Sequence, residues 1–275
     1  MRKLTILYCL TFLSGFANTQ SIFSALHLNE NREYKTARPK KIDETNTFYN
    51  SSGKKVYSNI KTFDEAGMLL KEERYGEYGD LQARLIYTND TINKLHLSRM
   101  FERTPTLLSY FKETAFYVYD SNHYLIGITD KDENGNIFRL TKIVNNKKGH
   151  PVEMEVLDRK GNPYGKETAS YLYDKNRVVT SVISNKGVAL SVDTIKISFL
   201  NAYLFPGDND IYNSHGDLTK WTSRNFDGTK TIFEEEHSYD SFGNCTENRI
   251  YKVTVKGNGK RKREIDRIFK KIYTY

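Results

Sequence analysis

Apolar and polar residues alternate along most of this chain in short stretches, and each stretch ends at a polar turn. In residues 195–199 the apolar side chains fall on one face of an extended strand and the polar ones on the other. In residues 117–119 and 171–173 two tyrosines share a face, and the aliphatic residue between them takes the opposite one. This period of two predicts β-strands in an antiparallel sheet with at least one face in water.

The turns between these stretches share one short phrase: an aromatic residue, Asp or Asn, two mostly polar residues, then Gly. Asp or Asn hydrogen-bonds its own backbone and starts the turn, and Gly takes the positive-φ position that side chains resist. Weaker copies begin at Lys131 and Leu157. The clearest copies are Tyr49-Asn50-Ser51-Ser52-Gly53, Phe63-Asp64-Glu65-Ala66-Gly67, Tyr212-Asn213-Ser214-His215-Gly216 and Tyr239-Asp240-Ser241-Phe242-Gly243.

The spacing of these turns, about a dozen residues, fits one strand and one turn per repeat. We therefore predict an all-β fold: a repetitive antiparallel meander that forms an extended or curved sheet, which can also close into a barrel-like shell. Two long intervals interrupt the rhythm. In the first, residues 88–118, we expect a helix or an edge excursion within 91–111. In the second, residues 189–211, we expect a loop at 205–210.

These phrases resemble the YD-repeat (Rhs-type) family, whose hallmark is Tyr-Asp-x-x-Gly, and they are also similar to MORN-like repeats. Residues 239–243 match the phrase in full, whereas Tyr119-Asp120 and Tyr173-Asp174 keep its first half. His123 and Arg177 stand where Gly is expected. The resemblance covers most of residues 49–275 and implies a β-sheet or shell that binds, encloses or displays something.

The N-terminus has the pattern of a secretory signal peptide. Two basic residues precede a short apolar run over residues 4–16, and Ala17 offers a cleavage site. We therefore expect a signal peptide at residues 1–17, an N-terminal tail or entry segment at 18–47 and a β-repeat domain at 48–275. Residues 29–47 are polar, and we expect them to be loosely ordered. The mature chain then keeps no transmembrane segment.

Cysteine and histidine usage points away from disulfide and metal chemistry. After cleavage Cys245 is the one remaining cysteine, so no internal disulfide can form. A catalytic thiol needs a basic partner, and the sequence identifies none. The six histidines are scattered singly, without the spacing of metal ligands. We expect no cofactor, no metal and no catalytic residue.

Two groups of residues are candidates for binding. The basic cluster follows Asn258-Gly259 and either forms the solvated flank of a hairpin turn or binds anionic lipids or acidic glycans; it consists of Lys260, Arg261, Lys262 and Arg263. The tyrosine group either packs across strands or forms an aromatic binding face; it consists of Tyr117, Tyr119, Tyr171 and Tyr173.

The functional prediction is an exported, non-enzymatic β-repeat protein that acts as a binding or interaction scaffold in the envelope of a Gram-negative bacterium. Its location is the periplasm or the outer surface, and its partner is an unknown protein or glycan. Export argues against nucleic acid as a partner. Two alternatives remain open: an immunity or antitoxin-like partner of a secreted toxin, and a carbohydrate-active enzyme that uses Glu234 and Glu236 as its carboxylates.

Overall fold

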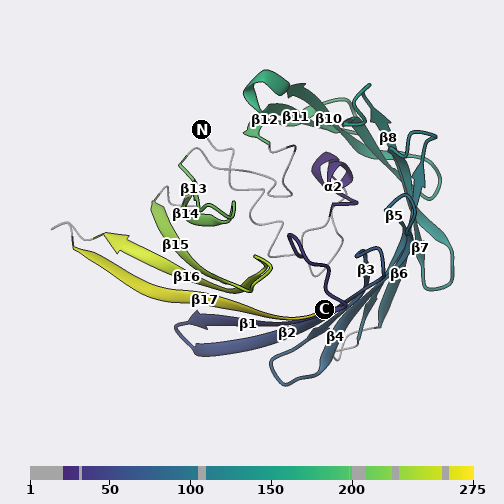
Figure 1. Ribbon diagram of the computed structural model, residues 1–275. Coiled ribbons are helices and arrows are strands. Elements are labelled where there is room, and N and C mark those ends of the chain that lie inside the picture. Colours follow the sequence, from purple (N-terminus) through teal and green to yellow (C-terminus); the bar gives the residue numbers. More distant parts are fainter. Residues whose placement is uncertain are drawn as a thin grey trace. The chain divides into compact units, whose positions relative to one another are not determined.

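The computed structural model describes residues 21–30, 33–104, 110–197, 199, 209–224, 229–255 and 260–275. Within these ranges the chain forms 17 strands, one short α-helix and one 3-10 turn (Figure 1). In chain order the elements are α2 (Ile22–Leu26), β1 (Lys41–Asn50), β2 (Gly53–Phe63), β3 (Leu69–Tyr75), β4 (Leu81–Asp90), β5 (Leu95–Arg103), β6 (Phe111–Tyr119), β7 (Leu125–Asp132), β8 (Ile137–Asn145), β9 (Pro151–Asp158), β10 (Pro163–Leu172), η1 (Tyr173–Lys175), β11 (Arg177–Ser184), β12 (Ala189–Lys196), β13 (Ile211–Tyr212), β14 (Leu218–Arg224), β15 (Lys230–Tyr239), β16 (Cys245–Val255) and β17 (Arg261–Thr274).

The strands belong to one antiparallel sheet in which sequence neighbours pair with each other, so the predicted all-β meander is confirmed. The first strand is the exception to this order, because β1 pairs with both β2 and β17. Its register with β17 runs from Lys41 opposite Thr274 to Phe48 opposite Arg267. The first and last strands of the repeat body are therefore hydrogen-bonded to each other.

The chain divides into two compact units. The first unit comprises Met1–Glu30, Thr88–Met100 and Lys112–Pro206, and the second comprises Asn31–Tyr87, Phe101–Phe111 and Gly207–Tyr275. Strands β7 to β12 and helix α2 belong to the first unit, whereas β1 to β3 and β13 to β17 belong to the second.

The turn phrase has the geometry that the sequence predicts. The Gly243 N–H donates to the Asp240 carbonyl at 3.1 Å, and Asp240 Oδ1 accepts the N–H of Asn244 at 2.9 Å. Gly243 has a φ of 76°. The weaker copies opened by Asp132 and Asp158 repeat the same bonds. A register shift accompanies the turn at the ends of the paired strands, as in a hairpin with a glycine bulge.

Of the two residues expected in place of the turn glycine, one takes that position and the other does not. His123 takes the glycine position with a φ of 65°. In the next weak copy it is Asn176, with a φ of 47°, that takes this position, and Arg177 already begins β11. Asparagine tolerates this left-handed conformation better than most side chains, because its short polar group bonds locally.

The first long interval contains a strand, so its interpretation as a helix is wrong. Strand β5 occupies Leu95–Arg103, and a turn with Lys94 at a φ of 56° precedes it. The Asp90 carboxylate accepts the N–H groups of Ile92 and Asn93 at 3.0 Å each. The side chain of Asp90 therefore starts this turn without the aromatic-to-glycine phrase. Most of the loop expected at 205–210 lies outside the described residues, as does the signal peptide.

Helix α2 covers an apolar face of the first unit. Its Ile22 and Phe23 side chains are buried and belong to one core cluster with Ala115, Ile128, Ile143, Met154, Ala169 and Val178. Ser21 caps the helix by accepting the N–H of Ser24 at 3.1 Å. The Ile22 N–H donates to the Glu167 carboxylate at 2.9 Å, which fixes the helix start on strand β10. This part of the expected tail is thus an ordered part of the core.

Residues 33–40 form hydrogen bonds with turns of the second unit. The Tyr34 hydroxyl donates to the Gly67 carbonyl at 2.8 Å, and the Lys35 N–H donates to Asn244 Oδ1 at 2.7 Å. The Lys35 ammonium lies 2.6 Å from the carboxylate of buried Asp217. Strand β1 then begins at residue 41, before the expected boundary at 48. The interpretation of this segment as a loosely ordered tail is wrong.

Charged side chains connect the segment before β1 with strands β1 and β2 of the second unit. Lys61 is only 7% exposed, and its ammonium lies 2.7 Å from Glu33 and 3.4 Å from Glu44. Burial alone would raise the pKa of Glu33, but Lys61 and Lys271 outweigh burial and leave the pKa below its ordinary value. Buried charges need such partners, because an unpaired one carries a large desolvation cost.

Candidate functional site

The basic cluster is engaged by two carboxylates that the sequence also singled out. Arg261 pairs with Glu234, and Arg263 Nη1 donates to Glu236 Oε1 at 2.7 Å. The Arg263 guanidinium also stacks on the Tyr251 ring at 3.6 Å. Lys262 pairs with Glu264 at 2.6 Å, while Lys260 lies exposed just before β17. Most of the charge of the cluster is therefore compensated within the sheet, and the proposed anion-binding role stays a prediction.

The same contacts determine what Glu234 and Glu236 can do. The arginine that donates to Glu236 keeps the pKa of that carboxyl below its ordinary value. General acid catalysis by a carboxyl group needs the opposite shift, towards neutral pH. These two residues lie two positions apart and so share one face of β15, where arginines of β17 reach them across β16.

The tyrosine group lies largely inside the first unit. Tyr117 is only 9% exposed and belongs to the core cluster beneath helix α2. The Tyr119 hydroxyl donates to the His96 carbonyl at 2.7 Å, and the Tyr171 hydroxyl donates to the Pro151 carbonyl at 2.8 Å. Burial raises the pKa of all three hydroxyls. These contacts favour the packing alternative for these three residues.

Tyr173 belongs to an aromatic cluster at the end of the strands. Its hydroxyl accepts the amide of Asn146 at 2.8 Å and lies 3.0 Å from His150 Nδ1. The Lys148 ammonium lies 3.8 Å from the centre of its ring, and the ring stacks with that of Tyr171. Tyr173 therefore ties η1 to the turn between β8 and β9, and both faces of its ring have neighbours.

The structure supplies the basic partner of Cys245 that the sequence did not identify. His237 Nδ1 lies 3.6 Å from Cys245 Sγ, and His237 Nε2 lies 2.7 Å from the Leu218 carbonyl. Nε2 must donate to that carbonyl, because a carbonyl oxygen can only accept, and the Cys245 thiol donates to the Glu247 carbonyl at 3.4 Å. Burial, assisted by Asp217, raises the pKa of the Cys245 thiol to about 11. A protonated, hydrogen-bonded thiol is a poor nucleophile at neutral pH.

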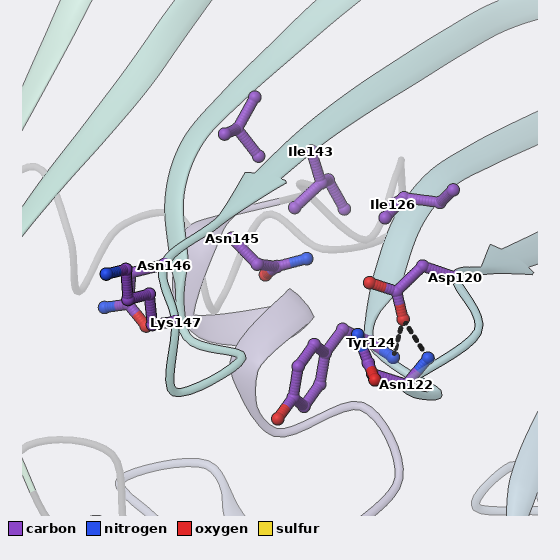
Figure 2. A pocket seen from close by; sticks show the side chains of 9 residues that line it. Asp120, Asn122, Tyr124, Ile126, Ile143, Asn145, Asn146 and Lys147 are labelled. Atoms are coloured by element: carbon purple, nitrogen blue, oxygen red, sulfur yellow. Dashed lines mark hydrogen bonds between the residues drawn. The ribbon is translucent and has the colours of Figure 1, made fainter.

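A hollow of about 350 Å³ lies between the turn joining β6 to β7 and the end of β8 (Figure 2). We call it the asparagine hollow. Three of its side chains are asparagines, and its walls are formed by Tyr124 and three aliphatic residues. It is lined by Asp120, Asn122, Tyr124, Ile126, Ile143, Val144, Asn145, Asn146 and Lys147.

Hydrogen bonds fix the frame of the asparagine hollow. Asp120 Oδ1 accepts the N–H groups of Asn122 and Tyr124 at 2.9 Å each, as the dashed lines in Figure 2 show. The Asn145 amide donates to the Leu125 carbonyl at 2.8 Å and ties β8 to β7. The Tyr124 ring rests on Gly149, where an added Cβ would lie 2.1 Å from the ring. The hollow is thus formed before any ligand arrives.

Several polar groups of the hollow remain available. Within the described part of the chain, Asp120 Oδ2, Asn145 Oδ1 and the Asn122 amide make no hydrogen bond. Beside them, Val144 is 55% exposed and Ile126 is 38% exposed. Donors and acceptors next to apolar walls characterise small-molecule sites, whose volumes run from roughly 300 to 1,000 Å³.

Sequence reasoning missed this site because each of its residues reads as turn chemistry. One signal was present in the Asn145-Asn146 pair. A turn needs one Asn to start it, and Asn146 does so by accepting the N–H groups of Lys148 and His150. Asn145 is therefore not needed to start the turn, and its side chain can take part in other interactions.

Two general properties complete the description of the site region. No group of three or more His, Cys, Asp or Glu side chains among the described residues could hold a metal ion. In the same part of the chain no helix has the length and apolar character needed to cross a membrane.

Comparison with known sequences gives no relative: no protein family matches the chain, and no curated protein matches it. Comparison with solved structures gives distant likenesses. A porin-like protein from Bacteroides uniformis is 12% identical over 87% of this chain and 99% of its own, with a TM-score of 0.46. The TcdB2-TccC3-Cdc42 structure is 11% identical over 79% of this chain, which spans 16% of that chain, with a TM-score of 0.20. The function must therefore be argued from the residues of this chain.

Proposed function

We propose that this chain is an exported, non-enzymatic β-repeat protein that acts as a binding scaffold in the bacterial envelope, in the periplasm or at the outer surface. We further propose that its ligand is an envelope glycan, held in the asparagine hollow. The observation that carries the proposal is the available amide and carboxylate groups beside exposed aliphatic walls in a preformed hollow.

Saccharides fit this combination of groups. Each sugar hydroxyl both donates and accepts, and the free amide of Asn122 can do both in return, while Asp120 Oδ2 accepts. The ring carbons of a sugar also present apolar surface, which can pack on Ile126 and Val144. Because the frame is held by hydrogen bonds, little ordering is needed on binding, which favours affinity.

The pKa values of two reactive groups support the non-enzymatic part of the proposal. Glu236 has a lowered pKa beside Arg263. Cys245 keeps its proton because its pKa is raised to about 11. The exported part is supported by the charged start, the short apolar run and the cleavage residue Ala17 in the sequence.

The test compares two asparagines in equivalent turns. Asn122 and Asn134 each stand two residues after a turn-opening aspartate, and each donates its N–H to that aspartate, at 2.9 and 3.0 Å. Only Asn122 lines the hollow. With soluble fragments of envelope polysaccharides in calorimetry, we expect Asn122→Ala to weaken binding about tenfold and Asn134→Ala to leave it unchanged.

Three outcomes would overturn parts of this proposal. Equal effects of the two substitutions would remove the asparagine hollow as the site. Turnover of a bound glycan would replace the scaffold by a carbohydrate-active enzyme. Capture of one stoichiometric protein from the envelope, with no glycan bound, would favour the immunity-type partner. For export, intact mass of the protein recovered from the envelope should show the loss of residues 1–17; a full-length cytoplasmic species would contradict it.

A further inference from the structure

The acceptor groups of the asparagine hollow are fixed by hydrogen bonds that the protein itself makes. Asp120 uses Oδ1 for the N–H groups of Asn122 and Tyr124, and its Oδ2 accepts no hydrogen bond within the described residues. The Asn145 amide donates to the Leu125 carbonyl at 2.8 Å. Because a carbonyl can only accept, the other end of the Asn145 side chain is Oδ1, which is also an acceptor. A ligand that satisfies both oxygens must bring donors.

An apolar surface lies beside the Asn145 oxygen. Ile143 and Asn145 are two residues apart on β8, so strand alternation places both on one face, with Cα atoms roughly 6.6 Å apart. The register of β7 with β8, in which Ile128 stands opposite Thr141, puts Ile126 on the same face. Figure 2 shows Ile126, Ile143 and Asn145 around one space. Ile143 is 5% exposed and Ile126 is 38% exposed, so the apolar surface runs from the core to the rim.

The charges in the lining favour a neutral ligand. The lining includes one carboxylate, that of Asp120, and one ammonium, that of Lys147. A cationic donor is attracted by the first and repelled by the second. A neutral N–H or O–H donor meets no such repulsion. The asparagine hollow therefore fits a neutral donor that is attached to a small apolar group.

An acetamido group combines these features. In a trans secondary amide the methyl group lies on the same side as the N–H, and the carbonyl oxygen lies on the opposite side. The N–H can therefore donate to Asn145 Oδ1 while the methyl group packs on Ile126 and Ile143. The carbonyl oxygen then accepts from the Asn122 amide. We propose that the asparagine hollow selects saccharides that carry an acetamido group, an inference that rests on the proposed glycan-binding function.

Two trisaccharides with the same β-1,4-linked backbone test this selectivity. Chitotriose carries an acetamido group on each ring, and cellotriose carries a hydroxyl group at the same carbon. In titration calorimetry the native protein should bind chitotriose at least about tenfold more tightly than cellotriose, because only the acetamido group fills the apolar part of the hollow. The de-N-acetylated trimer of glucosamine, which has ammonium groups instead, should also bind more weakly than chitotriose.

A pair of substitutions tests the place of the methyl group. Ile126→Ser removes the more exposed part of the apolar surface, so it should weaken chitotriose binding about fourfold and change cellotriose binding little. The matched control is Ile137→Ser, at a β8 residue that is 41% exposed and lies outside the hollow, and it should keep native affinity. Should Ile126→Ser fail to fold by circular dichroism, the comparison of trisaccharides on the native protein decides the question alone.

Three results overturn the inference: equal affinity for chitotriose and cellotriose, tighter binding of the glucosamine trimer, or equal effects of the two isoleucine substitutions. The glycan proposal is judged separately by Asn122→Ala. If a fragment without acetamido groups binds as tightly as chitotriose and Asn122→Ala weakens that binding, the glycan proposal stands and this inference falls. If no saccharide binds, both fall.

Discussion

The two units of this chain use the same turns and strands but cover their sheets in opposite ways. In the first unit, helix α2 places Ile22 and Phe23 against aliphatic side chains. In the second, residues 33–40 lie over polar strands, and buried Lys61 is held between Glu33 and Glu44. The turn phrase therefore determines where the chain reverses. It does not determine whether apolar contacts or ion pairs hold the segments, helix α2 and residues 33–40, that pack on the sheet.

The polar groups of the two units follow the same division. The asparagine hollow of the first unit offers amides and a carboxylate beside aliphatic walls. In the second unit, charged side chains pair with one another across strands, as where Arg263 donates to Glu236. Apolar contacts change little with pH or salt, whereas ion pairs depend on both. Substitutions that remove one interaction at a time test this contrast between the two units.

The largest effect is expected from Lys61→Met. It leaves Glu33 and Glu44 buried without their main counter-charge, so the free energy of unfolding should fall by about 3–5 kcal/mol. Urea unfolding followed by the fluorescence of Trp221, the single tryptophan and a residue of the second unit, measures it. The control is Lys270→Met, whose side chain is 57% exposed and pairs with Glu247 at 3.1 Å, and whose loss should cost less than about 1 kcal/mol. Equal costs would remove the charge network from the comparison.

For the apolar contact, Ile22→Ala should lower the free energy of unfolding by about 2–5 kcal/mol, because Ile22 is fully buried and the cavity would be only partly refilled. Circular dichroism during urea unfolding reports it. Leu190→Ala, at a site 67% exposed, should change stability by less than about 0.5 kcal/mol. If Ile22→Ala behaved like Leu190→Ala, helix α2 would not be part of the core.

Equivalent turn glycines in the two units should respond differently to alanine. Gly149 and Gly243 both have positive φ, at 78° and 76°, so each substitution carries strain of about 1–3 kcal/mol. An added Cβ at Gly243 meets nothing within 4 Å, but at Gly149 it meets the Tyr124 ring. Gly149→Ala should therefore destabilise more in urea unfolding. In a Tyr124→Ala background the two costs should become equal, and a persistent difference would contradict the role of the ring contact.

The smallest effects concern pH, and they have opposite signs in the two units. The pKa of Glu33 lies below its ordinary 4.5, so its contribution to stability is complete above pH 4.5 and is lost as the pH falls through the folded-state pKa. Burial raises the pKa of Glu167, against the opposing effect of the Ile22 N–H, so its contribution is complete below pH 4.5 and is lost as the pH rises through the folded-state pKa.

Urea unfolding between acidic and neutral pH tests both signs. Glu33→Gln should destabilise the protein at neutral pH and cost less as the pH falls. Glu167→Gln should become relatively more favourable as the pH rises. Glu65→Gln, at an exposed turn position, serves as the control. Parallel curves for the Glu33 and Glu167 variants would contradict the contrast.

Much of the fold could be predicted from single residues because turns are local. Asp132 and Asp158 open turns like that of Asp240, although their phrases lack the aromatic residue, since the bonds involve only the next four residues. The helix alternative for residues 91–111 was wrong because one turn in this interval does not carry the phrase. Asp90 and Lys94 form a turn that lacks the phrase, and β5 follows it.

The candidate sites could be predicted far less well, because each depends on which strand lies beside which. The sequence displays Lys260 to Arg263 as one cluster, but pairing of β17 with β16 and the reach of the side chains to β15 give the arginines to Glu234 and Glu236. For the tyrosines at 117 and 171 the sequence left open whether they pack across strands or form a binding face, and their contacts with the core cluster favour packing. Strand periodicity shows which residues share a face of the sheet. It does not show which other part of the chain contacts that face.

By itself, then, the sequence determined the strands, the turns and the antiparallel class, since these follow from hydrogen bonds and side-chain alternation within a dozen residues. Only the tertiary structure decided that β1 pairs with β17, that helix α2 packs on the first unit, and that residues 33–40 bind the turns of the second. The physical reason is distance along the chain. Contacts between residues far apart in sequence are selected by the burial and charge of the whole sheet, and no local pattern records them.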